Sequence, residues 1–212
     1  MAEKQARVYV FKPLIKLTFW ARLLMGVEMA GMAGWALAII LSMLADGRES
    51  LPVTLLGVVA ILLFVIGLFI GGVVSLCWVY GACRNAHVLR PAAKFSTPGW
   101  AVGWFFVPIA SLYKPYQALR DIWIASYGPV NGQYLKGPPL IVLWWWSFLI
   151  GNLILDFAKD TGEGIVYAPT LNNWMMVAGL LITGLSTAAF FVMTGDIHRH
   201  QLANKVGAAD IF

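Results

Sequence analysis

A charge-free run of 33 residues, from 51 to 83, constrains this chain more than any other feature of its sequence. A helix needs about 20 apolar residues to cross the hydrocarbon core of a bilayer, and this run exceeds that length. Composition agrees, because 60% of the residues are hydrophobic and 12% are charged, whereas soluble domains are about half apolar and a quarter charged. The run therefore indicates an integral membrane protein.

The spacing of the apolar residues predicts the type of secondary structure. Strands of a membrane β-barrel alternate apolar and polar side chains with a period of two, but the long runs here are continuously apolar. A helix satisfies its backbone hydrogen bonds within a single segment, as the bilayer interior requires. The predicted fold class is therefore an all-α integral membrane protein.

Four segments have the composition of membrane-spanning helices. They lie at about 23–45, 52–83, 138–156 and 172–195, and they predict a four-transmembrane-helix bundle over 23–196. A basic segment, 1–22, precedes this domain, and a short tail, 197–212, follows it. One further apolar stretch, 100–113, is interrupted by Pro108. At 1.5 Å per residue, this stretch falls short of a core about 30 Å thick.

The distribution of Lys and Arg decides whether the short stretch crosses the membrane. If it returns to its own side, 13 of the 15 Lys and Arg residues share that side, and Arg48 and Lys159 lie on the other. If it crosses, the split falls to nine against six. Cytoplasmic loops carry an excess of Lys and Arg. We therefore expect a re-entrant or interfacial broken helix over 98–125, between the second and third spans, and cytoplasmic N- and C-termini.

Small residues recur at every fourth position in the first two spans. The members are Gly26, Ala30, Gly34, Ala38 and Ser42 in the first span, and Gly67, Gly71 and Ser75 in the second. Small residues at this spacing let two membrane helices approach closely. The two stripes predict that the first and second spans pack together as a hairpin.

A series of short motifs runs from the end of the second span into the third. In order they are Arg84-Asn85, Pro98-Gly99-Trp100-Ala101-Val102-Gly103-Trp104, Pro108, Lys114-Pro115-Tyr116-Gln117, Arg120-Asp121 and Trp144-Trp145-Trp146. The series resembles a bacterial polytopic membrane protein family catalogued as domain of unknown function 4328. Asp121 stands where that family has Glu, and the residues at positions 110–113 differ from the usual sequence of the family. The resemblance implies a multi-pass, tryptophan-rich protein of the bacterial plasma (inner) membrane, and it carries no activity.

The broken helix allows two interpretations. Pro98 and Gly99 break the chain, Trp100 and Trp104 lie one turn apart as interfacial anchors, and Pro108 interrupts any helix in progress. Irregular backbone at membrane depth must be covered by protein or line water. The segment is therefore either the mouth of a cytoplasmic-side pocket, as in transporters, or an amphipathic helix that tryptophans hold at the interface.

A candidate polar site is centred on Glu28, which is the single acidic residue in the interior of a predicted span, since Asp156 ends the third. An isolated charge near the bilayer centre costs at least about 2.5 to 3.5 kcal/mol, so we expect Glu28 to contact Arg84 or Arg120. If Glu28 contacts neither arginine, its carboxyl group is a site for a proton or a ligand. The full set of candidate binding residues is Glu28, Arg84, Asn85, Gln117, Arg120 and Asp121.

The sequence offers little for catalysis or metal binding. Cys77 and Cys83 are about 9 Å apart along one helix and cannot form a disulfide. His198 and His200 point about 200° apart, although Asp196 and His200 could share a metal. No catalytic residue, cofactor or resident metal is assigned. The basic pI of 9.3 fits cytoplasmic loops near anionic lipid, without any need for nucleic acid.

Two hypotheses of function remain. In the first, the protein binds or passes a small molecule, lipid or ion at the polar site on the cytoplasmic side. In the second, it is a non-catalytic accessory or scaffold subunit, whose tryptophan-rich faces at Trp144, Trp145, Trp146 and Trp174 contact lipid or partner helices. The expected partners are membrane lipid and either a second copy of the chain or another membrane protein. An enzyme ranks third.

Overall fold

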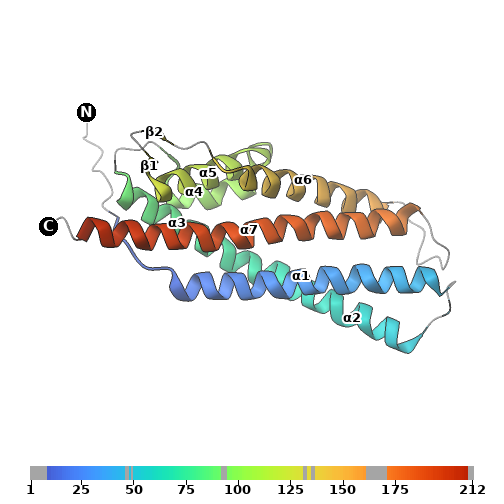
Figure 1. Cartoon of the computed structure of the whole chain (residues 1–212). Coiled ribbons are helices and arrows are strands. Elements are labelled where there is room, and N and C mark those ends of the chain that lie inside the picture. The colour runs from blue at the N-terminus through green and yellow to red at the C-terminus, as the bar shows by residue number, and fades with distance from the viewer. Residues whose placement is uncertain are drawn as a thin grey trace. The chain divides into compact units, whose positions relative to one another are not determined.

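The computed structural model describes residues 9–45, 48, 50–91, 95–130, 133–134, 137–160 and 171–209 (Figure 1). Its helices are α1 (Ile15–Leu44), α2 (Leu51–Ile66), α3 (Gly72–Leu89), α4 (Pro98–Gly103), α5 (Lys114–Tyr127), α6 (Pro139–Asp160) and α7 (Leu171–Ala209). A π turn, η1 (Gly67–Gly71), joins α2 to α3, and two 3-10 turns, η2 (Trp104–Phe106) and η3 (Ala110–Leu112), separate α4 from α5. The strands β1 (Pro129–Val130) and β2 (Gln133–Tyr134) form one short antiparallel pair.

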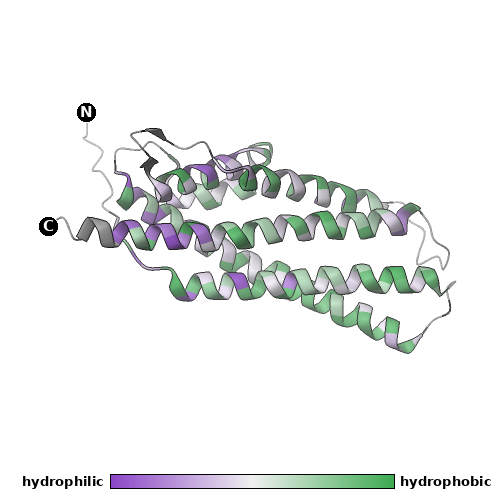
Figure 2. Ribbon diagram, viewed as in Figure 1, coloured by the Kyte–Doolittle hydropathy of each residue, from purple (hydrophilic) through white to green (hydrophobic). Residues whose placement is uncertain are grey.

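Four helices are long and apolar enough to cross a membrane. They cover Ile15–Leu44, Leu51–Leu89, Pro139–Ala158 and Leu171–Lys205, and Figure 2 shows hydrophobic residues along most of their length. The all-α, four-helix membrane class predicted from the sequence is therefore confirmed. The helices extend beyond the predicted spans, because α1 begins at Ile15 and α7 continues through most of the predicted tail to Ala209.

The chain divides into two compact units, each built from segments that are distant in sequence. The apolar unit comprises Phe19–Ser75 and Pro139–Thr194. The basic unit comprises Met1–Thr18, Leu76–Pro138 and Gly195–Phe212. The basic unit holds twelve Lys and Arg residues against four Asp and Glu residues, which gives it a formal net charge of +8 with His neutral. The apolar unit holds three Lys and Arg residues against six Asp and Glu residues. The two units therefore differ in the sign of their net charge as well as in hydropathy.

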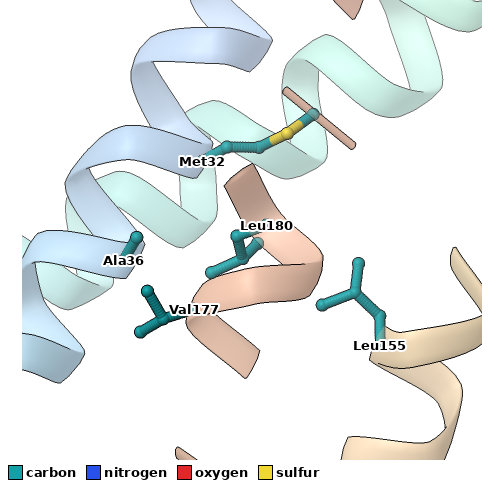
Figure 3. Packing of buried hydrophobic residues seen from close by; sticks show 5 residues of the cluster. All are labelled: Met32, Ala36, Leu155, Val177 and Leu180. Carbon is teal, nitrogen blue, oxygen red and sulfur yellow. The ribbon is translucent and has the colours of Figure 1, made fainter. Parts of the chain in front are cut away.

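The core of the apolar unit lies where α1, α6 and α7 meet. Its buried members are Met32, Ala36, Leu155, Val177 and Leu180 (Figure 3). Where α6 and α7 cross, Gly179 lies against Leu155 and Gly151 lies against Thr183. Lipid is as apolar as these side chains, so close van der Waals packing rather than burial from water stabilises the contact.

The α1–α2 contact within the apolar unit uses part of the predicted small-residue stripe. Gly34 lies against Ala60, Gly71 lies against Leu24, and Ala38 lies against Gly57. Gly26, in contrast, has no atom within 4 Å of the position its Cβ would occupy, and Ala30 is exposed. The predicted hairpin is present, but these two residues take no part in it.

The residues that do form the contact are separated by steps of three and four. On α1 they include Leu24, Glu28, Gly31, Gly34 and Ala38, and on α2 and η1 they are Gly57, Ala60, Phe64, Gly67 and Gly71. A strict four-residue stripe rotates by about 40° around the helix at each step, whereas alternating steps of three and four stay on one face. This is why a rule of every fourth residue found Gly34 and missed Gly31.

Candidate functional site

A buried amide, Asn85, joins the N-terminal segment to α3 in the basic unit. Its Oδ1 accepts a 3.0 Å hydrogen bond from the Lys12 backbone N–H, and its Nδ2 donates a 2.9 Å hydrogen bond to the Lys12 carbonyl. Nδ2 also donates to Oε1 of Gln201 at 3.2 Å. Both amide protons are therefore used inside the protein, which leaves Asn85 no free donor for a ligand.

Gln201 extends this network from α7 to α3 and α5. Its Nε2 donates to the Ala82 carbonyl at 3.0 Å and to Oγ of Ser126 at 3.0 Å. The Ser126 hydroxyl in turn donates to the Ile122 carbonyl at 2.7 Å, and the Asn204 amide donates to the Ser126 carbonyl. A buried network whose members all have partners rigidifies a core. The sequence analysis missed Gln201 and Ser126, because a lone amide or hydroxyl near a helix end carries no distinctive spacing.

Helices α4 and α5 form a hairpin (Figure 1), and this hairpin begins with capped and stacked residues. Thr97 caps α4 by accepting a hydrogen bond from the Trp100 N–H, and Pro98 occupies the first turn, where its missing N–H costs nothing. The Trp100 and Trp104 rings stack with centroids 4.5 Å apart, and Trp104 Nε1 donates to Oγ of Ser96 at 3.2 Å. Trp100 remains half exposed, whereas the indole N–H of Trp104 is held in place.

The tip of this hairpin is a tight, strained turn. Ile109 has φ 66°, which is rare for a β-branched residue, and the Ala110 N–H donates across it to the Pro108 carbonyl at 2.7 Å. The N–H groups of the next three residues also donate to carbonyls within the tip, and Pro108 has no N–H. Large apolar side chains point outward from this turn, namely Phe106, Ile109, Leu112 and Tyr113.

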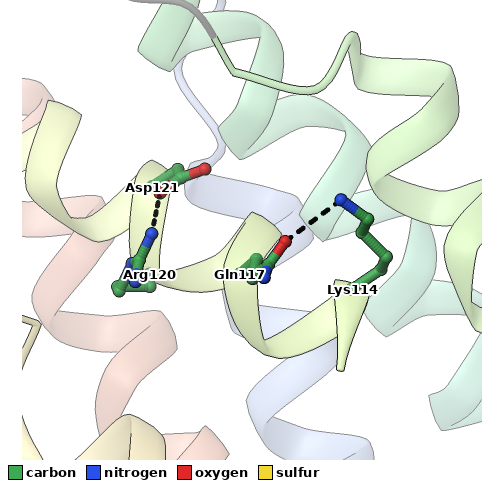
Figure 4. Close-up of polar contacts among 4 residues, drawn as sticks. All are labelled: Lys114, Gln117, Arg120 and Asp121. Carbon is green, nitrogen blue, oxygen red and sulfur yellow. Dashed lines mark hydrogen bonds and ion pairs between the residues drawn. The ribbon is translucent and has the colours of Figure 1, made fainter. Parts of the chain in front are cut away.

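Three of the predicted polar residues, Gln117, Arg120 and Asp121, lie with Lys114 in the first two turns of α5 (Figure 4). Lys114 Nζ donates to Oε1 of Gln117 at 3.2 Å, and Arg120 forms a 3.2 Å ion pair with Asp121. Lys114 Nζ also lies 5.5 Å from the ring centroid of Trp104. Burial raises the pKa of the Asp121 carboxyl above its ordinary value, although Arg120 and Lys114 act in the opposite direction.

Two guanidinium groups in the basic unit keep unused hydrogen-bonding capacity. The Nε atoms of Arg84 and Arg120 are buried and have no hydrogen-bond partner among the described residues. Because a guanidinium offers five donors in a planar fork, the single ion pair of Arg120 leaves other N–H groups available. Both residues were predicted site members, and both retain donors suited to an anion.

The histidines of the basic unit contact aromatic rings and carbonyls. His87 Nε2 lies 3.0 Å from the Ser96 carbonyl, and His200 stacks on Tyr127 with centroids 3.6 Å apart. Asp196, which could have shared a metal with His200, forms an ion pair with Arg199. No group of three or more His, Cys, Asp or Glu residues suited to a metal occurs in the part of the chain that the structure describes.

Glu28, the remaining predicted site residue, belongs to the apolar unit. Its backbone lies against Gly67 at the start of η1. Among the described residues, its carboxyl group forms neither a hydrogen bond nor an ion pair. Arg84 and Arg120 belong to the basic unit, and their contact with Glu28 stays a prediction.

The tryptophan triplet of α6 divides between the interior and the surface of the apolar unit. Trp144 and Trp145 are buried, and Trp144 stacks on Phe190 with centroids 5.4 Å apart. Trp144 and Trp145 therefore lie inside the unit rather than on a face open to lipid or a partner, and Trp144 packs against α7. Trp146 and Trp174 are exposed, and for these two a contact with lipid or a partner helix stays a prediction.

Comparison with known proteins yields one match. A family described as a domain of unknown function (DUF4328) matches residues 53–199, and no curated protein or solved structure matches the chain.

Proposed function

The chain belongs to this DUF4328 family, and we propose from its own geometry that it is a membrane protein that binds anionic phospholipid. The observation that carries the proposal is the α4–α5 hairpin, which places exposed apolar side chains at its tip and cations directly after it on α5. An apolar tip followed by Lys and Arg matches the order of hydrocarbon and phosphate in a leaflet. The basic unit then faces the cytoplasm of a bacterium, with both termini on that side of the inner membrane.

The tip is suited to enter hydrocarbon because its backbone is largely satisfied. The N–H groups of 110–113 donate within the turn, and unsatisfied N–H groups are what exclude irregular backbone from lipid. Lys114 lies at the base of the tip beside Trp104, which is the usual position of interfacial anchors. The strained φ of Ile109 is consistent with a functional turn, since such outliers cluster at functional sites.

Phosphate recognition is assigned to Arg84, Lys114 and Arg120. Arginine forks match phosphate oxygens bidentately, and the Nε atoms of both arginines lack partners among the described residues. The net charge of +8 on the basic unit adds a general attraction to anionic headgroups.

Native mass spectrometry of the detergent-purified protein tests the proposal. We expect preferential retention of phosphatidylglycerol over phosphatidylcholine, and a decrease of about fivefold in that preference for Arg120→Gln, since one cation near an anionic surface contributes about 1 kcal/mol. Arg199→Gln is the matched control, because Arg199 is exposed and paired with Asp196. Equal retention of the two lipids, or an equal effect of both substitutions, would contradict the proposal.

A fluorescent probe tests the depth of the hairpin tip. In a variant with Cys77 and Cys83 replaced by Ala, an environment-sensitive dye on Ile109→Cys should be quenched by spin-labelled acyl chains in liposomes. The same dye on Thr97→Cys, at the base of α4, should be quenched weakly. Equal quenching at both positions would favour a helix that lies flat on the interface over a re-entrant tip.

A second function, as an accessory or scaffold subunit, is favoured by the exposure of α2. Most of its large apolar side chains are exposed, including Leu55, Val58, Leu62, Val65 and Ile66. In a membrane such a face contacts lipid or a helix of a second protein. Stable co-purification of another membrane protein, lost on replacing this face, would support the second function, and an isolated monomer that retains lipid would support the first.

A further inference from the structure

Charge is nearly absent from the apolar stretches of the apolar unit. Residues 19–44, 51–75, 139–155 and 171–194 contain two charged side chains, Arg22 and Glu28. The guanidinium carbon of Arg22 lies 4.0 Å from the ring centroid of Phe191. Arg22 also precedes Glu28 by six residues, or about 9 Å along the helix. Arg22, which is the one cation of α1 within the apolar unit, therefore packs against Phe191.

Glu28 occupies a distinctive place in the helix contact. It lies against Gly67, where an added Cβ would clash with the Glu28 Cβ and come within 2.7 Å of the Glu28 Cα, so the two helices approach too closely for any side chain at residue 67. Gly67 begins η1, the π turn of the spanning helix. Single π turns inside α-helices are frequent at functional sites. The acidic residue and the irregular turn thus meet at the same point.

Apart from Arg22, the spanning stretches of the apolar unit that the structure describes contain no other titratable group. The helices of this unit contribute no acidic, basic or histidine side chain from 51–75, 139–155 or 171–194. The structure gives the Glu28 carboxyl neither a hydrogen bond nor an ion pair among the described residues. A carboxylate removed from water without a cation is disfavoured relative to the neutral acid.

We propose that Glu28, seated against Gly67 at the π turn, is a proton-binding site within the membrane. At neutral pH it is the carboxylic acid, and it releases its proton when water or a cation gains access. The ion pair with Arg84 or Arg120 expected from the sequence is the alternative state. The proposal concerns the apolar unit alone and is independent of lipid binding by the basic unit.

Dicyclohexylcarbodiimide, an apolar reagent for protonated carboxyl groups, tests this assignment on the full chain in liposomes. Peptide mass spectrometry should find the adduct on Glu28 at about pH 6.5, with labelling that falls about tenfold per pH unit above the midpoint of titration. Asp156, exposed near the end of α6, is the control and should react with a water-soluble carbodiimide instead. An unlabelled Glu28 between about pH 5 and 9 would overturn the proposal.

The Tm of Glu28→Gln distinguishes the protonated Glu28 from an ion-paired Glu28, because glutamine resembles the neutral acid and the two states predict opposite changes. The proposal expects an unchanged Tm near neutral pH and a Tm above that of the wild type at about pH 9.5, where the wild-type carboxyl would have to ionise. An ion pair predicts a lower Tm for Glu28→Gln at neutral pH, since its arginine partner would be left unpaired. A drop of that kind, reduced when Arg84 or Arg120 is also replaced by Gln, would overturn the proposal.

Discussion

The Asn85 amide is buried in the basic unit, where an unpaired polar group is costly. Replacing it with Ala leaves the Lys12 backbone groups and Gln201 Oε1 without their partners. Since each unsatisfied buried group costs about 1 to 3 kcal/mol, we expect Asn85→Ala to lower the free energy of unfolding by at least about 3 kcal/mol. Chemical denaturation in detergent measures this change.

Asn152→Ala is the matched control for the Asn85 experiment. The Asn152 amide makes one local hydrogen bond, to the Phe148 carbonyl one turn earlier. Such a bond contributes about 0.5 to 1.5 kcal/mol at most. If both substitutions proved equally mild, the Asn85 network would not stabilise the basic unit.

Asp121 gives the basic unit a pH-dependent contribution to stability. Its folded-state pKa is raised above the ordinary value of 3.8 by burial, so its contribution is complete below that value and is lost as pH rises through the folded-state pKa. Asp121→Asn cannot ionise. The Tm of this variant should therefore rise relative to the wild type as pH increases from about 4 to 7. A difference in Tm that stays constant with pH would show that Asp121 titrates normally.

At the scale of elements, the α1–α2 contact provides a sharp comparison between two glycines of one helix. A Cβ on Gly31 would lie 2.8 Å from the Ala60 carbonyl oxygen, whereas a Cβ on Gly26 would meet no atom within 4 Å. Overpacking costs about 1 to 3 kcal/mol. We expect Gly31→Leu to separate the helices and to lower Tm and folded yield in detergent, while Gly26→Leu should be tolerated. Equal tolerance would exclude Gly31 from a tight contact.

The α4–α5 hairpin shows how local chemistry and tertiary packing share the control of an element. Thr97, Pro98 and Pro115 mark helix starts that sequence rules recognise. No residue type in the sequence indicated the positive φ of Ile109 or the hydrogen bond across it. Glycine or asparagine is the usual signal for that backbone conformation, and neither occurs at this position. The break after Val107 could be predicted, but the shape of the turn could not.

For the whole molecule, the proposed orientation places the loop after α1 outside and the loop before α4 inside. With Cys77 and Cys83 replaced by Ala, a membrane-impermeant maleimide added to intact bacteria should label Ser50→Cys. Thr97→Cys should be labelled after the cells are opened. Labelling of Thr97→Cys in intact cells would reverse the orientation or add a crossing before α4. Two other positions suited to this test, Gly132 and Gly162, lie outside the described residues.

The amino-acid sequence was sufficient to predict the membrane class, the all-α fold, the four long helices and the family. These features depend on the length and composition of single segments, which the bilayer thickness and the need to satisfy backbone hydrogen bonds constrain directly. It also identified Gly34, Gly67 and Gly71 as contact residues, since small side chains are required wherever membrane helices approach closely.

Only the tertiary structure decided which polar residues act together. Asn85, Ser126 and Gln201 are far apart in the chain and meet because three helices pack in one unit, and no spacing rule connects residues on separate helices. The same holds for Trp144 and Trp145, which have the composition of an interfacial anchor but are buried within the apolar unit, Trp144 against Phe190 of α7. Burial depends on which helix covers a face, and that depends on the packing of the whole unit.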